Sequence, residues 1–288
     1  MKYRVITNPG SGSGVGKKTE TQLKTYLDAK EIDYEIFETK AKGHARELAA
    51  SFGGGTIIAV GGDGTFHEVL NGIDTENCRL GFVPSGRGND FAATMGLERK
   101  PLKALDVILD GAPAEIDYID AGGGLRCLNV CGTGLDVAVL ENVANKKDTK
   151  FTYLMSLLYC IMHFTPYELD VQIGDGEIRH FSCIMAGVCN GKQFGGGIKL
   201  SPNSSLTSGK LDVIVMELPE KNKIMRALWG FVGGKHLDKP YTHAFECERV
   251  KVTSSANYPI ELDGEIYRDR VLDCRVVKSG LKTFRKVN

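Results

Sequence analysis

The segment with the clearest chemical potential is "GGDGT", which directly follows the apolar run "TIIAV". Gly61 and Gly62 allow a tight turn and let a ligand approach the backbone. Asp63 offers a carboxylate that can hold magnesium or a hydroxyl group. Gly64 and Thr65 open the next predicted helix, whose free N–H groups would face an anion. An aspartate that merely ends a turn or caps a helix is the alternative, and the strand-turn-helix setting favours the anion site.

A second glycine-rich loop, "NPGSGSGVGKKT" at residues 8–19, follows the first apolar run. It is not a P-loop, because Ser11 stands where that motif requires glycine and Lys18 where it requires serine or threonine. It is not a dinucleotide-binding loop either, because the third glycine position falls on Val15 or Lys17, depending on the register. An anion-binding loop and a flexible turn both remain open for this stretch alone.

The elements that must position these loops alternate between strand and helix over residues 1–118. The predicted strands are 3–7, 33–38, 56–60, 79–83 and 114–118. The predicted helices are 17–30, 42–52, 65–73, 88–95 and 101–110. Such alternation indicates a parallel sheet with helices on its faces. Ligands of these sheets bind at the carboxyl ends of the strands, where both glycine loops lie.

From about residue 119 the pattern changes to short strands separated by turns, and the first strand-like stretch is "LRCLNVCGTGLDVAVL". Asp175-Gly176 and Asp263-Gly264 are typical hairpin dipeptides, and two predicted helices, at 149–163 and 219–235, interrupt the strands. The sequence therefore predicts a second, mostly β domain after a boundary at "DAGGG".

Composition restricts the function classes. The chain has 36 Lys plus Arg and 36 Asp plus Glu, so bulk charge gives no support to nucleic-acid binding. The eight cysteines form no C-x-x-C pair, which favours buried free thiols in a reducing cytoplasm. The longest apolar stretch, residues 151–164, is shorter than the roughly 20 residues that a membrane-spanning helix needs.

Six motifs in order resemble those of the bacterial diacylglycerol kinase-like, YegS-type lipid kinases, a family that sphingosine and ceramide kinases join. They are "NPGSG", "GGDGT", "PSGRGNDFA", "LNVCGTGLDVAV", "GVCNGKQFGGGIKLSPNSSLTSGKLDVIV" and "ELDGE". NAD kinases share the second motif but would lack the last. The resemblance implies a Rossmann-like α/β nucleotide-binding domain of the NAD kinase and diacylglycerol kinase type at 1–119. It implies a mostly antiparallel β-sandwich at 120–288, which carries the general base and the lipid site.

The resemblance also implies site residues. The ATP contacts would be Asn8, Pro9, Gly10, Ser11, Gly12, Thr39, Gly61, Gly62, Asp63, Gly64, Thr65, Glu68 and Arg87. Glu265 matches the residue taken as general base in the family, and Asp263 would position it or contact metal. Asp63 and Asp90 would serve a catalytic magnesium, with Asp63 as its ligand, or orient the acceptor.

Several positions leave alternatives open. Lys17 and Lys18 could reach phosphate or could lie in a solvated first helical turn. Asp117 matches a family aspartate, with Asp120 as its rival.

This sequence departs from the family pattern twice. Arg87 replaces the family threonine, so a planar cation could grip phosphate or could hinder the usual pose. Many relatives hold a structural magnesium through acidic residues where Ser205 and Ser208 stand here. Hydroxyls are poor replacements for carboxylates, so we expect that metal to be absent or weakly bound.

The expected activity is an ATP- and Mg²⁺-dependent lipid kinase acting on a hydroxyl of a diacylglycerol-like lipid, with its site between the two domains. Another lipid substrate, such as a sphingoid base or monoacylglycerol, or a non-catalytic ATP-binding regulator, is the alternative. The helices at 151–163 and 221–235 suit reversible attachment to the inner membrane leaflet, although they could simply pack on the β domain. The expected partner is a lipid at a membrane surface, not nucleic acid, and a homodimer is compatible with the sequence.

Overall fold

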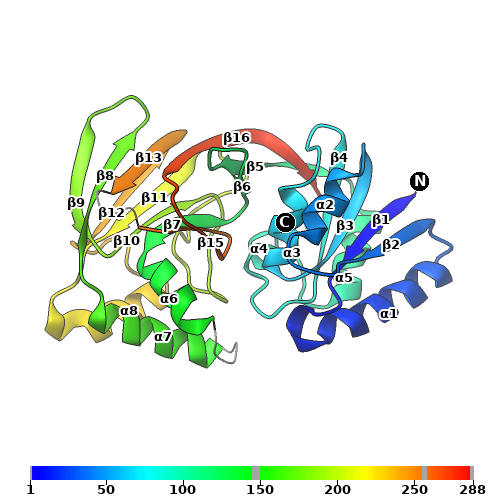
Figure 1. Ribbon diagram of the computed structural model, residues 1–288, viewed down its shortest axis with the longest axis horizontal. Helices are drawn as coiled ribbons and strands as arrows, with labels where there is room; N and C mark the ends of the chain where they lie inside the picture. The colour runs from blue at the N-terminus through cyan, green and yellow to red at the C-terminus, as the bar shows by residue number, and fades with distance from the viewer. Residues whose placement is uncertain (1, 145–149, 255–257, 286–288) are drawn as a thin grey trace. The chain divides into compact units, whose positions relative to one another are not determined.

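The structure is a computed structural model that describes residues 2–144, 150–254 and 258–285. The chain divides into two compact units (Figure 1), Met1–Tyr118 together with Lys278–Asn288, and Ile119–Val277. The second unit thus ends before the chain terminus, which differs from the predicted division at 120–288. The reason is that the end of β16 (Leu272–Thr283) pairs in parallel with β4 of the first unit, through Lys282 and Thr283.

The first unit is built on a parallel sheet with the strand order β2-β1-β3-β4. The strands are β1 (Tyr3–Thr7), β2 (Tyr34–Glu38), β3 (Gly55–Gly61) and β4 (Cys78–Pro84), and β5 (Ala114–Asp120) follows them in the chain. The central strands are buried almost throughout, as expected for apolar runs covered on both faces. The predicted α/β architecture with a parallel sheet is therefore confirmed.

Helices follow the strands at the predicted positions. They are α1 (Val15–Ala29), after the 3₁₀ turn η1 (Ser11–Ser13), α2 (His44–Ala50), α3 (Asp63–Leu70), α4 (Asp90–Thr94) and α5 (Pro101–Asp110). Leu23 and Leu27 of α1 and Leu105 and Ile108 of α5 pack in one core cluster with strand residues such as Ile58. Their spacing of three or four residues produces the apolar stripe that the sheet covers.

The second unit is an antiparallel β-sandwich. One sheet has the order β12-β11-β10-β7-β14-β15, and the other contains β13, β8 and β9 beside β16. The bounds are β6 (Arg126–Cys127), β7 (Val130–Gly134), β8 (Tyr167–Ile173), β9 (Ile178–Cys183), β10 (Met185–Cys189), β11 (Leu211–Met216), β12 (Thr242–Cys247), β13 (Arg249–Ser254), β14 (Ile260–Leu262) and β15 (Glu265–Tyr267). Cys131, Val213, Val252 and Leu272 meet in the core between the sheets. This confirms the predicted sandwich.

Helices cover the outer face of the six-stranded sheet (Figure 1). They are α6 (Leu135–Val143), α7 (Lys150–His163) and α8 (Ile224–Val232), the last preceded by the 3₁₀ turn η2 (Lys221–Lys223). The prediction of a strand through "LDVAVL" is wrong, because Gly134, with φ of 104°, ends β7 and turns the chain into α6. Leu135 and Val139 then reach the same core cluster, which a helical spacing of four allows. In the described residues no helix is long and apolar enough to cross a membrane.

Candidate active site

Three loops of the first unit meet at the carboxyl ends of β1, β3 and β4, and backbone hydrogen bonds join them. The Asn8 N–H donates to the carbonyl oxygen of Val60 at 3.0 Å. The Ser85 and Gly86 N–H groups both donate to the carbonyl oxygen of Gly61, at 2.7 and 3.2 Å. The loop at 8–14, "GGDGT" and "PSGRGND" therefore form one continuous backbone surface at the sheet edge where ligands of parallel sheets bind.

Close backbone approach explains the glycines of this surface. A Cβ on Gly86 would lie 2.5 Å from the Cα atom of Gly62, and a Cβ on Gly12, which has φ of 59°, would lie 2.5 Å from the Ser85 carbonyl oxygen. These contacts are with backbone atoms and cannot be relieved by a side-chain rotation. Gly86 was not among the predicted site residues, although the motif "PSGRGND" contains it.

Side-chain hydrogen bonds hold the three loops together. The Asn8 Nδ2 group donates to Thr65 Oγ1 at 3.1 Å, while Asn8 Oδ1 accepts the Gly10 N–H at 3.1 Å. The Ser11 and Ser85 hydroxyls lie 2.7 Å apart. The loops are thus preorganised, and the amide of Gly10 is engaged within its own loop.

Asp63 and Asp90 are brought together by a cap. The two carboxylate oxygens of Asp63 accept the N–H groups of Asp90 and Phe91, each at 3.2 Å. Asp63 therefore caps α4, the helix after the neighbouring strand. Asp90 itself is buried at the first position of that helix. The two carboxyl groups lie at the same edge as the glycine loops.

Other predicted ATP contacts lie around this centre. Pro9 is half-buried between Asn8 and Gly10, and Gly64 lies in the first turn of α3. The Thr39 N–H donates to the Thr7 carbonyl oxygen at 2.8 Å, which places Thr39 just beyond β2. Arg87 is exposed in the loop after β4.

Glu68 and Lys17 make contacts that the sequence did not indicate. The Glu68 carboxylate accepts the N–H groups of Gly43 and Ala45 at 2.8 and 3.2 Å, and so caps α2. The Lys17 ammonium lies 2.9 Å from Glu38 and 3.3 Å from Glu20, and these hydrogen bonds raise the pKa of Lys17. Both side chains are therefore committed to neighbouring elements in this structure.

In the second unit, the predicted catalytic carboxylates lie on the β14–β15 hairpin. Its two turn residues, Asp263 and Gly264, have φ of 50° and 89°, as a tight hairpin turn requires. The Asp263 carboxylate accepts the N–H groups of Leu128 and Asn129 at 2.9 and 2.8 Å. Glu265 is half-buried at the first position of β15. Asp263 therefore anchors the turn that presents Glu265.

A second D-G-E sequence, Asp175-Gly176-Glu177, occurs in the β8–β9 hairpin and is exposed at all three residues. Its turn closes through a backbone hydrogen bond from the Gly176 N–H to the Ile173 carbonyl oxygen at 3.0 Å. The tertiary contacts of Asp263 and the partial burial of Glu265 distinguish the two copies.

The two rival aspartates near the boundary both support the backbone. Asp117 accepts the Ser279 N–H at 2.9 Å. Asp120 accepts the Gly122 N–H at 3.0 Å and pairs with Arg275 at 2.9 Å. Neither contact favours one of them as a site residue.

Within residues 2–144, 150–254 and 258–285, no group of three or more His, Cys, Asp or Glu side chains is placed to hold a metal ion. At the position where relatives hold the structural magnesium, the Ser208 hydroxyl donates to the carbonyl oxygen of Ser205 at 3.2 Å. The Ser205 hydroxyl accepts the Thr207 N–H at 3.4 Å. The weak or absent structural metal stays a prediction.

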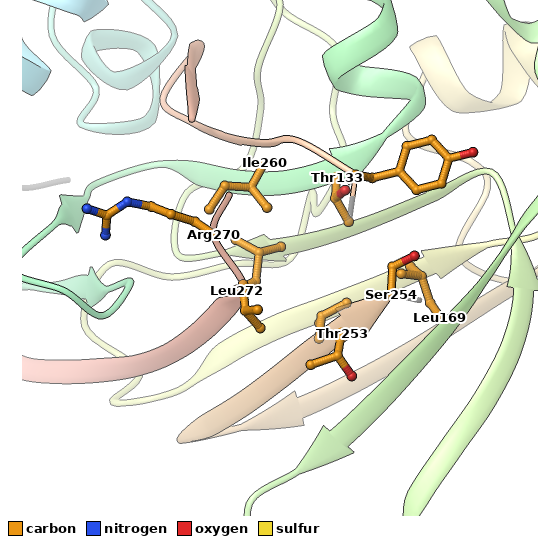
Figure 2. A pocket seen from close by; sticks show the side chains of 10 residues that line it. Thr133, Leu169, Thr253, Ser254, Ile260, Arg270 and Leu272 are labelled. Atoms are coloured by element: carbon orange, nitrogen blue, oxygen red, sulfur yellow. The ribbon is translucent and has the colours of Figure 1, made fainter. Parts of the chain in front are cut away.

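A pocket in the second unit is not the candidate site. Figure 2 shows it among Leu169, Thr253, Ile260 and Leu272. The volume of this pocket is about 30 Å³. That volume suits one or two water molecules, not a nucleotide.

Two models of known protein families match this chain. Residues 2–121 match the family model of the diacylglycerol kinase catalytic domain, and residues 129–284 match the YegS C-terminal, NAD kinase β-sandwich-like domain. The Bacillus subtilis diacylglycerol kinase is 30% identical over 273 residues, covering 92% of this chain and 89% of that protein.

Solved structures share the fold. The crystal structure of a diacylglycerol kinase from Bacillus anthracis superposes with a TM-score of 0.76 at 20% identity, covering 99% of this chain and 97% of that one. An NAD kinase from Archaeoglobus fulgidus in complex with ATP gives a TM-score of 0.56 at 14% identity, covering 99% and 94%. The family models over both halves, together with the identity to the curated relative, show that the chain belongs to the diacylglycerol kinase and YegS-like family of lipid kinases.

Proposed function

We propose that this lipid kinase uses ATP and Mg²⁺ to phosphorylate a hydroxyl of a diacylglycerol-like lipid. The observation that carries the proposal is the backbone surface formed by three glycine-containing loops at the strand ends. Backbone amides and the start of α1, which has no acidic residue in its first turn, suit the phosphates of a nucleotide. The related folds include a protein solved with ATP.

The available donors fit a magnesium ion that arrives with the nucleotide. Mg²⁺ commonly uses one or two protein carboxylates and completes its shell with phosphate oxygens and water. Asp63 and Asp90 would hold it, so a larger cluster of acidic residues is not needed. When bound, the ion would neutralise charge on the transferring phosphoryl group.

The chemistry requires a base for the acceptor. Glu265 would take the proton of the lipid hydroxyl while the oxygen of that hydroxyl bonds to the γ-phosphorus of ATP. The bond from that phosphorus to the bridging oxygen breaks, and ADP leaves. Because the phosphate loops belong to one unit and Glu265 to the other, joint action of the two units is part of this proposal.

Transfer of labelled phosphate tests the activity. The protein is incubated with γ-labelled ATP, Mg²⁺ and detergent micelles that contain diacylglycerol, monoacylglycerol, a sphingoid base or ceramide, with NAD as a further acceptor. We expect the largest transfer to diacylglycerol. Transfer to another lipid would revise the substrate, transfer to NAD alone would contradict the lipid assignment, and ATP binding without transfer would indicate a regulator.

We also propose that α7 and α8 attach the enzyme reversibly to an anionic membrane surface. Exposed large hydrophobic side chains of the described residues gather on these two helices, namely Met155, Tyr159, Met162, Met225 and Trp229. The spacing of three or four residues places the exposed side chains of each helix on one stripe, and the buried residues Leu157 and Phe231 lie on the opposite side of their helices. Lys221 and Arg226 add exposed positive charge beside the stripe of α8. Apolar side chains flanked by cations suit an interface with anionic lipid.

Vesicle co-sedimentation tests this surface. The double variant Tyr159→Ala/Trp229→Ala is expected to bind phosphatidylglycerol-containing vesicles at least about tenfold more weakly than the wild type, because two exposed aromatic rings are lost. Ile178→Ala, which removes an exposed apolar side chain from β9, is the matched control and should bind as the wild type does. Equal binding of all three proteins would contradict the assignment.

A further inference from the structure

The hairpin that carries Glu265 is held by hydrogen bonds on both sides of its turn, and the catalytic importance of these bonds rests on the proposed function. Asp263 fixes one side of the turn through Leu128 and Asn129. The other turn residue, Gly264, is exposed, and its N–H donates to Glu261 Oε2 at 2.7 Å. In a two-residue hairpin turn, the N–H of the second turn residue has no partner in the strand ladder. A side chain therefore supplies the missing acceptor.

Glu261 makes this contact from a buried position. Its neighbour Ile260 and the residue opposite, Thr133, point into the pocket between the sheets (Figure 2). Because side chains alternate along a strand, Glu261 points to the opposite face, which α6 covers. Glu261 is only 2% exposed. Burying a carboxyl group so deeply costs free energy unless hydrogen bonds or a retained proton compensate for the lost hydration.

Asp136 of α6 lies beside Glu261 on this face. Gly132 pairs with Glu261 across β7 and β14, and a Cβ on Gly132 would lie 2.1 Å from Asp136 Oδ2. The glycine thus leaves the space that the Asp136 carboxyl fills, next to the Glu261 side chain. Asp136 is also 2% exposed, and both Asp136 Oδ2 and Glu261 Oε1 are buried without a hydrogen-bond partner.

Two adjacent buried carboxyl groups disfavour double ionisation. Burial raises the pKa of Asp136 to about 7, and burial together with the neighbouring Asp136 carboxyl raises the pKa of Glu261 well above its usual range. A proton kept by the pair leaves no more than one negative charge in this buried space, while Glu261 Oε2 remains the acceptor for Gly264.

We propose that Glu261, supported by Asp136, is the positioning residue of the catalytic hairpin. It fixes the Gly264 amide and thereby the direction in which β15 presents Glu265. It does not itself exchange a proton with the substrate. Its effect should therefore fall on turnover and not on substrate binding, because a small misplacement of a catalytic group is costly.

Two variants of Glu261 test the role of the acceptor. Glu261→Gln keeps an oxygen for the Gly264 N–H and offers an amide N–H₂ group to Asp136. Glu261→Met has a similar length and no such oxygen. We expect Glu261→Met to lower kcat about 10- to 100-fold with the KM values for ATP and lipid unchanged, and Glu261→Gln to stay near the wild type. Equal kcat for Glu261→Met and the wild type, or equal losses of kcat in Glu261→Met and Glu261→Gln, would overturn the proposal.

Amide hydrogen exchange gives a readout that does not depend on activity. In ¹⁵N-labelled protein, Gly264 should exchange about tenfold faster in Glu261→Met than in Glu261→Gln or the wild type, as loss of one hydrogen bond implies. Gly176, whose amide bonds to a backbone carbonyl in the other D-G-E hairpin, is the internal control for a folded sandwich. Unchanged exchange at Gly264 would refute the positioning contact. Failure of wild-type transfer to every lipid would instead refute the proposed function.

Discussion

Glu265→Gln is expected to lower kcat about 10²- to 10⁴-fold, because glutamine cannot accept the proton of the lipid hydroxyl. Glutamine keeps the size and polarity of the side chain, so the β14–β15 hairpin should persist. The KM for ATP should stay within about twofold, since this residue is assigned to the acceptor and not to the nucleotide. Steady-state phosphate transfer at saturating ATP measures the effect.

The chain supplies a matched control in its second D-G-E sequence. Glu177→Gln makes the same chemical change after the same two residues, in an exposed hairpin of the same unit. Its kcat should equal that of the wild type. If Glu265→Gln were as active as Glu177→Gln, Glu265 would not be the base and the assignment of the late carboxylate would be wrong.

Gly86→Ala should abolish most ATP binding, with an affinity lower by about 10- to 100-fold. The added Cβ would lie 2.5 Å from the Cα atom of Gly62, so the second and third phosphate loops must move apart. Such overpacking should also destabilise the first unit by about 1–3 kcal/mol. Isothermal titration with ATP and thermal melting measure the two effects.

Gly53→Ala separates this steric effect from a general cost of removing glycine. No heavy atom lies within 4 Å of a Cβ placed on Gly53. Its stability should therefore change by no more than about 0.5 kcal/mol, with unchanged ATP affinity. Wild-type affinity in Gly86→Ala would show that the contact of the two loops does not shape the nucleotide site.

Much of the fold follows from local sequence patterns. Two elements could be located from the sequence, namely the buried strand "TIIAV" and the amphipathic helix that contains Leu105 and Ile108. A strand buried on both faces is a continuous apolar run, and a helix buried on one face has apolar residues three or four positions apart. The strand prediction for the α6 segment was wrong, because the apolar period of this segment is ambiguous. "LDVAVL" is short and rich in β-branched residues, so its period cannot separate a strand from a helix, and a positive φ at Gly134 decides between them.

The loops of the first unit were located correctly at the strand ends, but their internal contacts were not foreseen. That Gly86 packs on Gly62, or that Glu68 caps α2 through Gly43, depends on which loops the fold brings together. The return of residues 278–285 to the first unit likewise depends on β16 pairing with β4. Contacts between distant segments leave no local period in the sequence.

By itself the sequence determined the order of the elements, the two architectures and the motifs that could bind phosphate and carry a base. The tertiary structure alone decided which of two identical D-G-E turns is anchored. Asp263 meets the amides of Leu128 and Asn129, and Glu261 meets Gly264 from a buried face beside Asp136. The physical reason is that a carboxyl group acquires its role from the donors and the solvent around it, and the donors to Asp263 come from a segment more than a hundred residues away.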